Sequence, residues 1–162
     1  MGIAEELLAL AGYLATSPSP AFEQAAFRRS VSTAYYALFH LLIHEAADRW
    51  SGSAEARLGL ERAFKHNNMK EISGVVSKGS WKSWSTPPLT VPAELEELAE
   101  AFFRLQEARH VADYDNTKIW TFTEVDLRIA QARTAFQNWQ NIQTDPATHE
   151  YLLALLIGKK RE

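Results

Sequence analysis

The segment RLQEARHVADYD, residues 104–115, brings two arginines and one histidine within a few positions of one another. An arginine close to a histidine can cleave RNA without a metal ion. The guanidinium stabilises the phosphate and its developing charge, and the imidazole, with a pKa near neutrality, moves the 2′-hydroxyl proton. Which arginine faces a partner therefore decides whether the segment is a reactive site or an ordinary helix end.

Position on a helix separates the two arginines, because successive residues are about 100° apart. Arg104 lies opposite Leu95, on the side that also carries Glu97 and Glu100. We expect it to be an exposed partner of Glu100 at i,i+4. Arg104 and His110 fit an Arg-x5-His count, but on a continuous helix they point about 120° apart.

Arg109 falls on the apolar side of the same helix, with Leu95 and Phe102, and Asp113 shares that face one turn later. A charge that faces a core must be paired or must line a pocket. Two interpretations stay open here. Arg109 and Asp113 either form a structural pair that joins the helix to its neighbour, or they have a functional role.

A second set of polar residues recurs every three or four positions along an otherwise apolar or small stretch at 30–43. The set comprises Arg29, Thr33, Tyr36, His40 and His44. It is either the solvated face of a helix or the lining of a cleft or dimer seam that includes Tyr36 and His40. His40 and His44 at i,i+4 could also bind a metal, but this stripe has no glutamate and the chain has no cysteine. We therefore predict no metal site and no cofactor.

Apolar residues recur at helical spacing along nearly the whole chain, and strand-like alternation is absent. Helices are predicted at about 3–16, 21–50, 54–76 and 93–113, from about 123 to at least 139, and at 146–157. Residues 77–92, which contain three prolines, are predicted to form a long loop. The sequence thus predicts a single all-α domain, an up-and-down bundle of five to six helices with its core at about 21–143.

Local signals mark several of the predicted helix ends. In chain order they are Ser19 with Pro20 before the second helix, Thr123 with Asp126 as a capping-box-like start of the fifth, Asp145 with Pro146 at the last, and Gly158 ahead of a basic tail at 159–161.

Composition limits the class of protein. The chain has 162 residues, and its 46% hydrophobic and 23% charged residues are typical of a globular domain. Without cysteine it has no disulfide, thiol nucleophile or cysteine-ligated metal. With 17 Lys+Arg against 20 Asp+Glu, any contact with nucleic acid must be a local patch. No basic region precedes an apolar stretch at the start, and no apolar run is long enough to span a membrane, so we expect a cytoplasmic protein.

Two motifs together, RRSVSTAYYALFHLL at 28–42 and RHVADYD at 109–115, resemble the HEPN superfamily of prokaryotic helical proteins. The resemblance covers about residues 21–139 and is strongest to small single-domain members with an Arg-x-x-Ala-Asp-Tyr signature. It implies a bundle of four to six helices and a homodimer with the signature arginines of both protomers near one cleft. Such proteins act as RNA-cleaving toxins, or as RNA- or nucleotide-binding modules, in toxin–antitoxin and phage-defence systems. Some pair with a nucleotidyltransferase.

The nuclease motif of that family is Arg-x4–6-His. Four to six residues separate the arginine from the histidine, and the first of them is polar. Carried over from Arg109, His110 matches the polar position, but Tyr114, Asp115 and Asn116 fill the place of the histidine. A tyrosine, with a pKa of about 10, is a poor general base at neutral pH. In the folded protein, His110 or His40 could lie close enough to Arg109 to replace the missing histidine.

Three functions follow from these observations. The first is an RNA- or nucleotide-binding module of a toxin–antitoxin or phage-defence system with little nuclease activity of its own. The second is a metal-independent endoribonuclease toxin that uses Arg109 with His110 or His40. The third is a non-catalytic dimeric partner of a nucleotidyltransferase or an antitoxin. The candidate catalytic residues are Arg109, His110 and Tyr114, and the candidate binding residues are Arg29, Tyr36, His40 and Asp113.

A homodimer is expected on a second ground. Tyr35, Phe39 and Ile43 lie beside the main apolar face of the helix at 21–50, so this helix carries more apolar surface than one core-facing stripe needs.

Overall fold

The computed structural model describes residues 1–16 and 18–158. Within these residues the protein forms seven α-helices and one 3-10 turn, and no strand. The helices are α1 (Ile3–Ala15), α2 (Glu23–Trp50), α3 (Ala54–Ala63), α4 (His66–Ser77), α5 (Ala93–Tyr114), α6 (Phe122–Ile142) and α7 (Pro146–Ile157), and the 3-10 turn η1 covers Pro20–Phe22. The predicted all-α bundle is confirmed, with seven helices in place of five to six.

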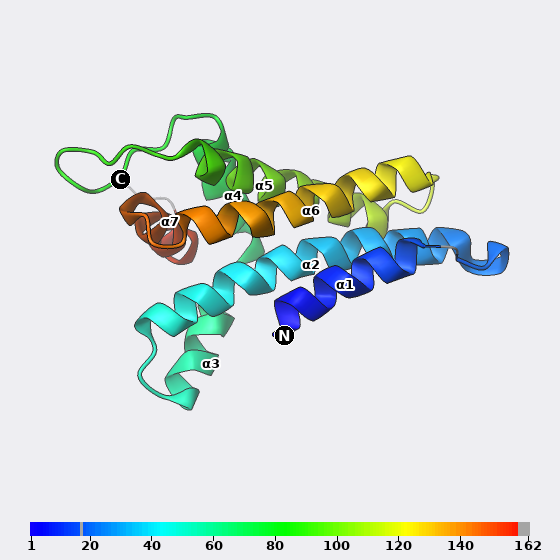
Figure 1. The fold of residues 1–162 in the computed structure, drawn as a ribbon, viewed down its shortest axis with the longest axis horizontal. Coiled ribbons are helices and arrows are strands. Elements are labelled where there is room, and N and C mark those ends of the chain that lie inside the picture. The colour runs from blue at the N-terminus through cyan, green and yellow to red at the C-terminus, as the bar shows by residue number, and fades with distance from the viewer. Residues whose placement is uncertain (17, 159–162) are drawn as a thin grey trace.

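Helix α2 is the central element of the bundle. Helices α1, α5 and α6 all pack against it. Figure 1 shows α1 and α6 running along either side of α2. Because it is covered from several sides, α2 is buried around most of its circumference. Tyr35, Phe39 and Ile43 are 0%, 9% and 4% exposed. These side chains are buried within a single chain, so they are no longer evidence for a dimer interface.

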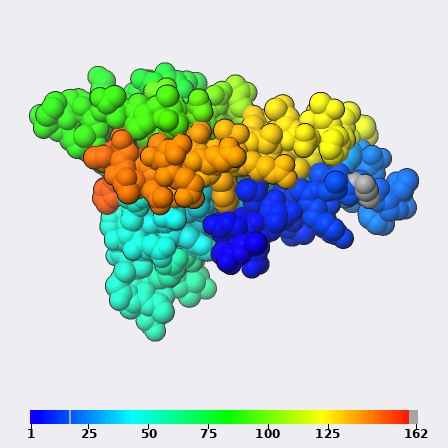
Figure 2. All heavy atoms as spheres, in the orientation of Figure 1, coloured from blue at the N-terminus to red at the C-terminus, as the bar shows by residue number. Residues whose placement is uncertain are grey.

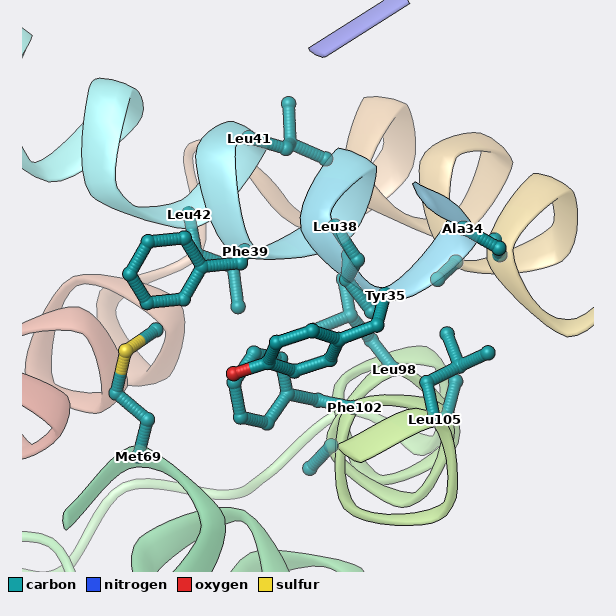
Figure 3. Close-up of a cluster of buried hydrophobic side chains, with 14 of the residues drawn as sticks. Ala34, Tyr35, Leu38, Phe39, Leu41, Leu42, Met69, Leu98, Phe102 and Leu105 are labelled. Carbon is teal, nitrogen blue, oxygen red and sulfur yellow. The ribbon is translucent and has the colours of Figure 1, made fainter. Parts of the chain in front are cut away.

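The core between α2 and α5 is built from aromatic and branched side chains (Figure 3). The Tyr35 ring lies against the Phe102 ring, with centroids 5.4 Å apart, and Leu38, Leu98 and Leu105 are fully buried around them. Close packing of this kind makes the position of each helix face sensitive to its neighbours. The seam between α2 and α5 therefore fixes which α2 side chains meet Arg109.

The helix predicted over 54–76 is two helices in the structure. Phe64 and Lys65 are extended, and Phe64 is buried although no residue of α3 is. Burying this phenylalanine against the core breaks the helix, and α3 protrudes from the body of the molecule (Figure 2). Helix α4 then lies close to α5, where a Cβ atom on Gly74 would be 3.1 Å from the Phe103 ring. The break makes His66 the first residue of α4.

Two of the predicted helix starts are wrong. Ser19 makes no side-chain cap bond, and Pro20 begins the turn η1, with α2 following at Glu23. Helix α6 begins with a capping box of Thr121 and Glu124, in which each side chain accepts from the other residue's backbone N–H. The predicted pair, Thr123 and Asp126, lies two residues further on, inside the first turns of α6.

The last helix begins and ends as predicted. The Asp145 side chain accepts from the Ala147 N–H, Pro146 is the first helical residue, and Gly158 has a φ of +76° just after the end. The basic tail at 159–161, and Ser17 in the first linker, lie outside the described residues. Among the helices described, none combines the length and apolar character needed to cross a membrane.

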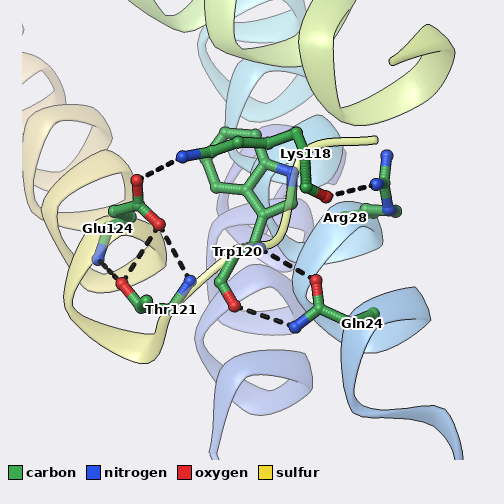
Figure 4. Close-up of polar contacts among 6 residues, drawn as sticks. All are labelled: Gln24, Arg28, Lys118, Trp120, Thr121 and Glu124. Atoms are coloured by element: carbon green, nitrogen blue, oxygen red, sulfur yellow. Dashed lines mark hydrogen bonds and ion pairs between the residues drawn. The ribbon is translucent and has the colours of Figure 1, made fainter. Parts of the chain in front are cut away.

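The turn between α5 and α6 is held against α2 by two side chains (Figure 4). The guanidinium of Arg28 donates to the carbonyls of Ala112, Asp115 and Lys118, at 3.0, 2.8 and 2.6 Å. The Gln24 amide donates to the carbonyl of Trp120 and accepts from its N–H, both at 2.8 Å. These bonds fix the end of α5, which carries Arg109 and Asp113.

Candidate functional site

Arg109 is the arginine that faces inward. Its side chain is 13% exposed, and its guanidinium lies over the Tyr35 ring, 5.2 Å from the centroid. Its Nη1 is 3.7 Å from a carboxylate oxygen of Asp113, which also accepts a long hydrogen bond of 3.4 Å from Ser32. The buried Nε has no hydrogen-bond partner among the described residues. The predicted Arg109–Asp113 pair is confirmed, and it leaves part of the guanidinium's donor capacity unused.

Arg104 is the exposed arginine, as predicted. Its side chain is 54% exposed and its Nε is 3.0 Å from a carboxylate oxygen of Glu100. Exposed pairs of this kind contribute little to stability. Arg104 is therefore a matched control for Arg109, since both arginines lie on the same helix.

A histidine that the sequence did not point to lies beside Arg109. The Nδ1 of His66, at the start of α4, is 2.5 Å from the hydroxyl oxygen of Tyr35. Its ring stacks on Phe39, with centroids 4.4 Å apart and planes 20° apart, and meets the edge of Tyr36 at 6.1 Å. We call the following group the Arg109 cluster: Ser32, Tyr35, Tyr36, Phe39, His66, Arg109 and Asp113.

Burial sets the protonation state of this cluster. It lowers the pKa of His66, and the positive charges of Arg109 and, when protonated, His40 lower it further. Burial also raises the pKa of Tyr35 well above its usual value, against a smaller lowering effect of Arg109. At neutral pH the cluster therefore holds a neutral imidazole, a protonated tyrosine and a charged arginine.

His40 lies next to the cluster and does not join it by a hydrogen bond. Its ring meets the edge of Phe39 at 5.6 Å, and its buried Nδ1 has no partner in the part of the chain that the structure describes. His44 is 5.5 Å away between ring centroids, and its Nε2 is 3.5 Å from Glu61. Across residues 1–16 and 18–158, no group of three or more histidine, aspartate or glutamate side chains is placed to hold a metal ion.

The polar stripe on α2 is not a solvated face. Thr33 is buried, Tyr36, His40 and His44 are half-buried, and only Arg29 is exposed. Helices α3 and α5 pack against α2, and His66 at the start of α4 contacts Tyr36 and Phe39. The solvated-face interpretation therefore holds only for Arg29, and the cleft or dimer-seam interpretation stays a prediction.

His110 and Tyr114 lie outside the Arg109 cluster. Both are exposed at the end of α5, with ring centroids 5.0 Å apart. Tyr114 lines an open groove of about 420 Å³ together with Arg29 and Asp113.

Of the seven predicted site residues, the structure brings Arg109, Asp113 and Tyr36 together. It places Arg29 and Tyr114 along the groove that Asp113 also lines, His40 next to the cluster against Phe39, and His110 outside the cluster.

The lowered pKa values of His40 and His66 predict a dependence of stability on pH. Burial is the first cause for both residues. Below about pH 6.5 the unfolded chain binds more protons at these positions than the folded chain. The free energy of unfolding should therefore fall as the pH is lowered from about 7 to 5. Urea denaturation across this range measures the slope, which should be shallower in His66→Gln than in the wild type. Equal slopes for wild type and His66→Gln would contradict the assignment.

The arrangement can bind an anion. The guanidinium of Arg109 lies over the Tyr35 ring and the imidazole of His66 contacts the Tyr35 hydroxyl, and both groups contain N–H donors of the kind that bind phosphate oxygens. No signal in the sequence pointed to His66, because its place beside Tyr35 depends on the break at Phe64 and Lys65 that the structure shows. Known protein-family models, curated proteins and solved structures give no match to this chain.

Proposed function

We propose that the protein is an RNA- or nucleotide-binding module of the HEPN type, in a toxin–antitoxin or phage-defence system, and that the Arg109 cluster holds a phosphate group. The observation that carries the proposal is the inward Arg109, whose Nε lacks a partner beside the half-buried His66. A largely buried guanidinium that is only partly paired is costly in a protein unless it is used.

Binding of a labelled single-stranded RNA, followed by fluorescence anisotropy, tests this proposal. We expect Arg109→Gln to weaken binding by about tenfold or more, because it removes a charge-assisted phosphate contact. Arg104→Gln, with its charge on the exposed side of the same helix, should change binding by less than about twofold. Both variants remove one positive charge from α5. A difference in their affinity for RNA therefore shows that the position of the charge matters. Equal affinities would reject the site, and competition by AMP or ATP would favour a nucleotide as the ligand.

A second candidate function is metal-independent cleavage of RNA by Arg109 with His66. The specific observation that favours it is that His66 stands beside Arg109, where the sequence offered no histidine. RNA incubated with chelator and purified protein should be cleaved weakly or not at all if the first proposal holds. Strong chelator-resistant cleavage, lost in Arg109→Gln and in His66→Gln, would establish the second. Cleavage abolished by chelator would reject metal-independent catalysis at this site.

The homodimer and the partnership with a nucleotidyltransferase or an antitoxin are part of the same proposal. Their present support is the resemblance of the two motifs, since Tyr35, Phe39 and Ile43 are buried within one chain. Light scattering at micromolar concentration should give twice the mass of the 18.3 kDa chain. A monomeric mass would remove the shared cleft from the proposal and leave each Arg109 cluster to act alone.

A further inference from the structure

The contact between Tyr35 and His66 determines which nitrogen of the imidazole carries the proton. Tyr35 is 0% exposed, and its hydroxyl is 2.5 Å from Nδ1 of His66. That nitrogen is the one hydrogen-bond partner of the hydroxyl in the described part of the chain. Figure 3 shows the Tyr35 side chain lying in the core between α2 and α5.

A hydroxyl carries a proton that must be donated to an acceptor when it is buried. If Nδ1 of His66 carried a proton and donated to Tyr35, the tyrosine's own proton would be left without an acceptor. If Tyr35 donates to Nδ1, both groups are satisfied. The second arrangement leaves Nδ1 unprotonated, so in a neutral ring the proton is on Nε2.

We propose that Tyr35 holds His66 as a neutral imidazole with its proton on Nε2, so that the Arg109 cluster presents donors to its ligand. In this state His66 donates to a phosphate oxygen, together with the guanidinium of Arg109. Its Nδ1 lone pair is already used by Tyr35, so the ring has no free base to take a 2′-hydroxyl proton. Tyr35 is thus a positioning residue, and the inference rests on the proposed function only for the identity of the ligand.

The surroundings of the ring support this state. Phe39 stacks on His66 and Tyr36 lies perpendicular to it, so the plane of the ring is fixed, and the bond to Tyr35 selects Nδ1. The positive charge of Arg109 disfavours the imidazolium, and burial acts in the same direction on the pKa of His66. Burial also raises the pKa of Tyr35, so its hydroxyl keeps the proton that it donates. The same contacts explain why a histidine beside an arginine would bind RNA without cleaving it.

Long-range ¹H–¹⁵N correlation spectra of the ring nitrogens test the tautomer in the free protein, with the His66 signals assigned by their loss in His66→Gln. The wild type should show the pattern of a neutral ring with its proton on Nε2. In Tyr35→Phe the two nitrogens should move toward each other's shifts, because both tautomers become populated. The titration midpoint of His66 should also rise, since a hydrogen bond that favoured the neutral ring is lost. Tyr36→Phe, which removes a neighbouring hydroxyl, should keep the wild-type pattern.

A proton on Nδ1 in the wild type, or the same pattern in wild type and Tyr35→Phe, would overturn the inference. Neither measurement uses RNA, so the two proposals fail separately. A His66 with its proton on Nε2, in a protein that binds no RNA or nucleotide, would reject the proposed function and keep the tautomer.

Discussion

Replacing Arg28 with alanine is expected to lower the free energy of unfolding by about 3 kcal/mol. One guanidinium donates to three backbone carbonyls, those of Ala112, Asp115 and Lys118. Two of these carbonyls belong to the end of α5 and its cap, where backbone groups have no partner within the helix and where a positive charge is favourable. Removing the side chain leaves three acceptors without their donor and loosens the turn that leads into α6.

Arg29 is the matched control, because it is the next residue on α2 and its side chain is exposed. Arg29→Ala should stay within about 0.5 kcal/mol of wild type. Arg28→Lys should fall between the two, since an ammonium keeps the charge but has no planar fork to reach three carbonyls. Urea denaturation midpoints measure all three variants. Equal midpoints for Arg28→Ala and Arg29→Ala would mean that the turn is held by other contacts.

The second large effect is expected at Arg109, where the alanine variant should lose about 2 kcal/mol of stability. The substitution removes the cation from the face of Tyr35 and leaves the carboxylate of Asp113 without its partner on a largely buried surface. Arg104→Ala removes an exposed pair with Glu100 and should change stability by less than about 0.5 kcal/mol. Thermal or urea unfolding of the two variants measures the difference.

The Asp113→Asn variant separates the contribution of charge from that of packing at the Arg109–Asp113 pair. With the carboxylate replaced by an amide, Arg109 keeps its stacking on Tyr35 but loses its ion pair. The double variant Arg109→Ala with Asp113→Asn should recover part of the stability lost in Arg109→Ala, because no unpaired charge remains. Comparable midpoints for Arg109→Ala and Arg104→Ala would show that the inward position of Arg109 contributes nothing to stability.

The helical pattern of the sequence predicted most of the fold, because amphipathic spacing is a local property. The helix at 93–113 was placed to within one residue, and its two arginines were assigned to the correct sides. One error lies where two local signals competed, at the start of α6. Thr121 with Glu124 and Thr123 with Asp126 both fit a capping pattern, and the longer glutamate side chain reaches the backbone N–H of the cap residue.

The candidate site was only partly visible, because its members come from three helices. Arg109 and Asp113 could be found from the face of one helix, since a charge among apolar residues is a local anomaly. His66 could not be found in this way. It lies at the start of a short helix, among polar residues, and gains its role through contacts with Tyr35 and Phe39 that depend on how α4 packs. Tertiary contacts of this kind leave no period in the sequence.

The order in which the chain is made has a consequence for the Arg109 cluster, whose parts lie at 32–39, 66 and 109–113. Synthesis releases the N-terminal helices first. The tyrosine and phenylalanine side chains of α2 therefore cannot pack against α5 until α5 has been synthesised and has docked. Until then the guanidinium of Arg109 has no contact with the ring of Tyr35, and the cluster is incomplete. Because Arg109 and Asp113 lie in the last third of the chain, the cluster can be complete only when most of the chain has been synthesised.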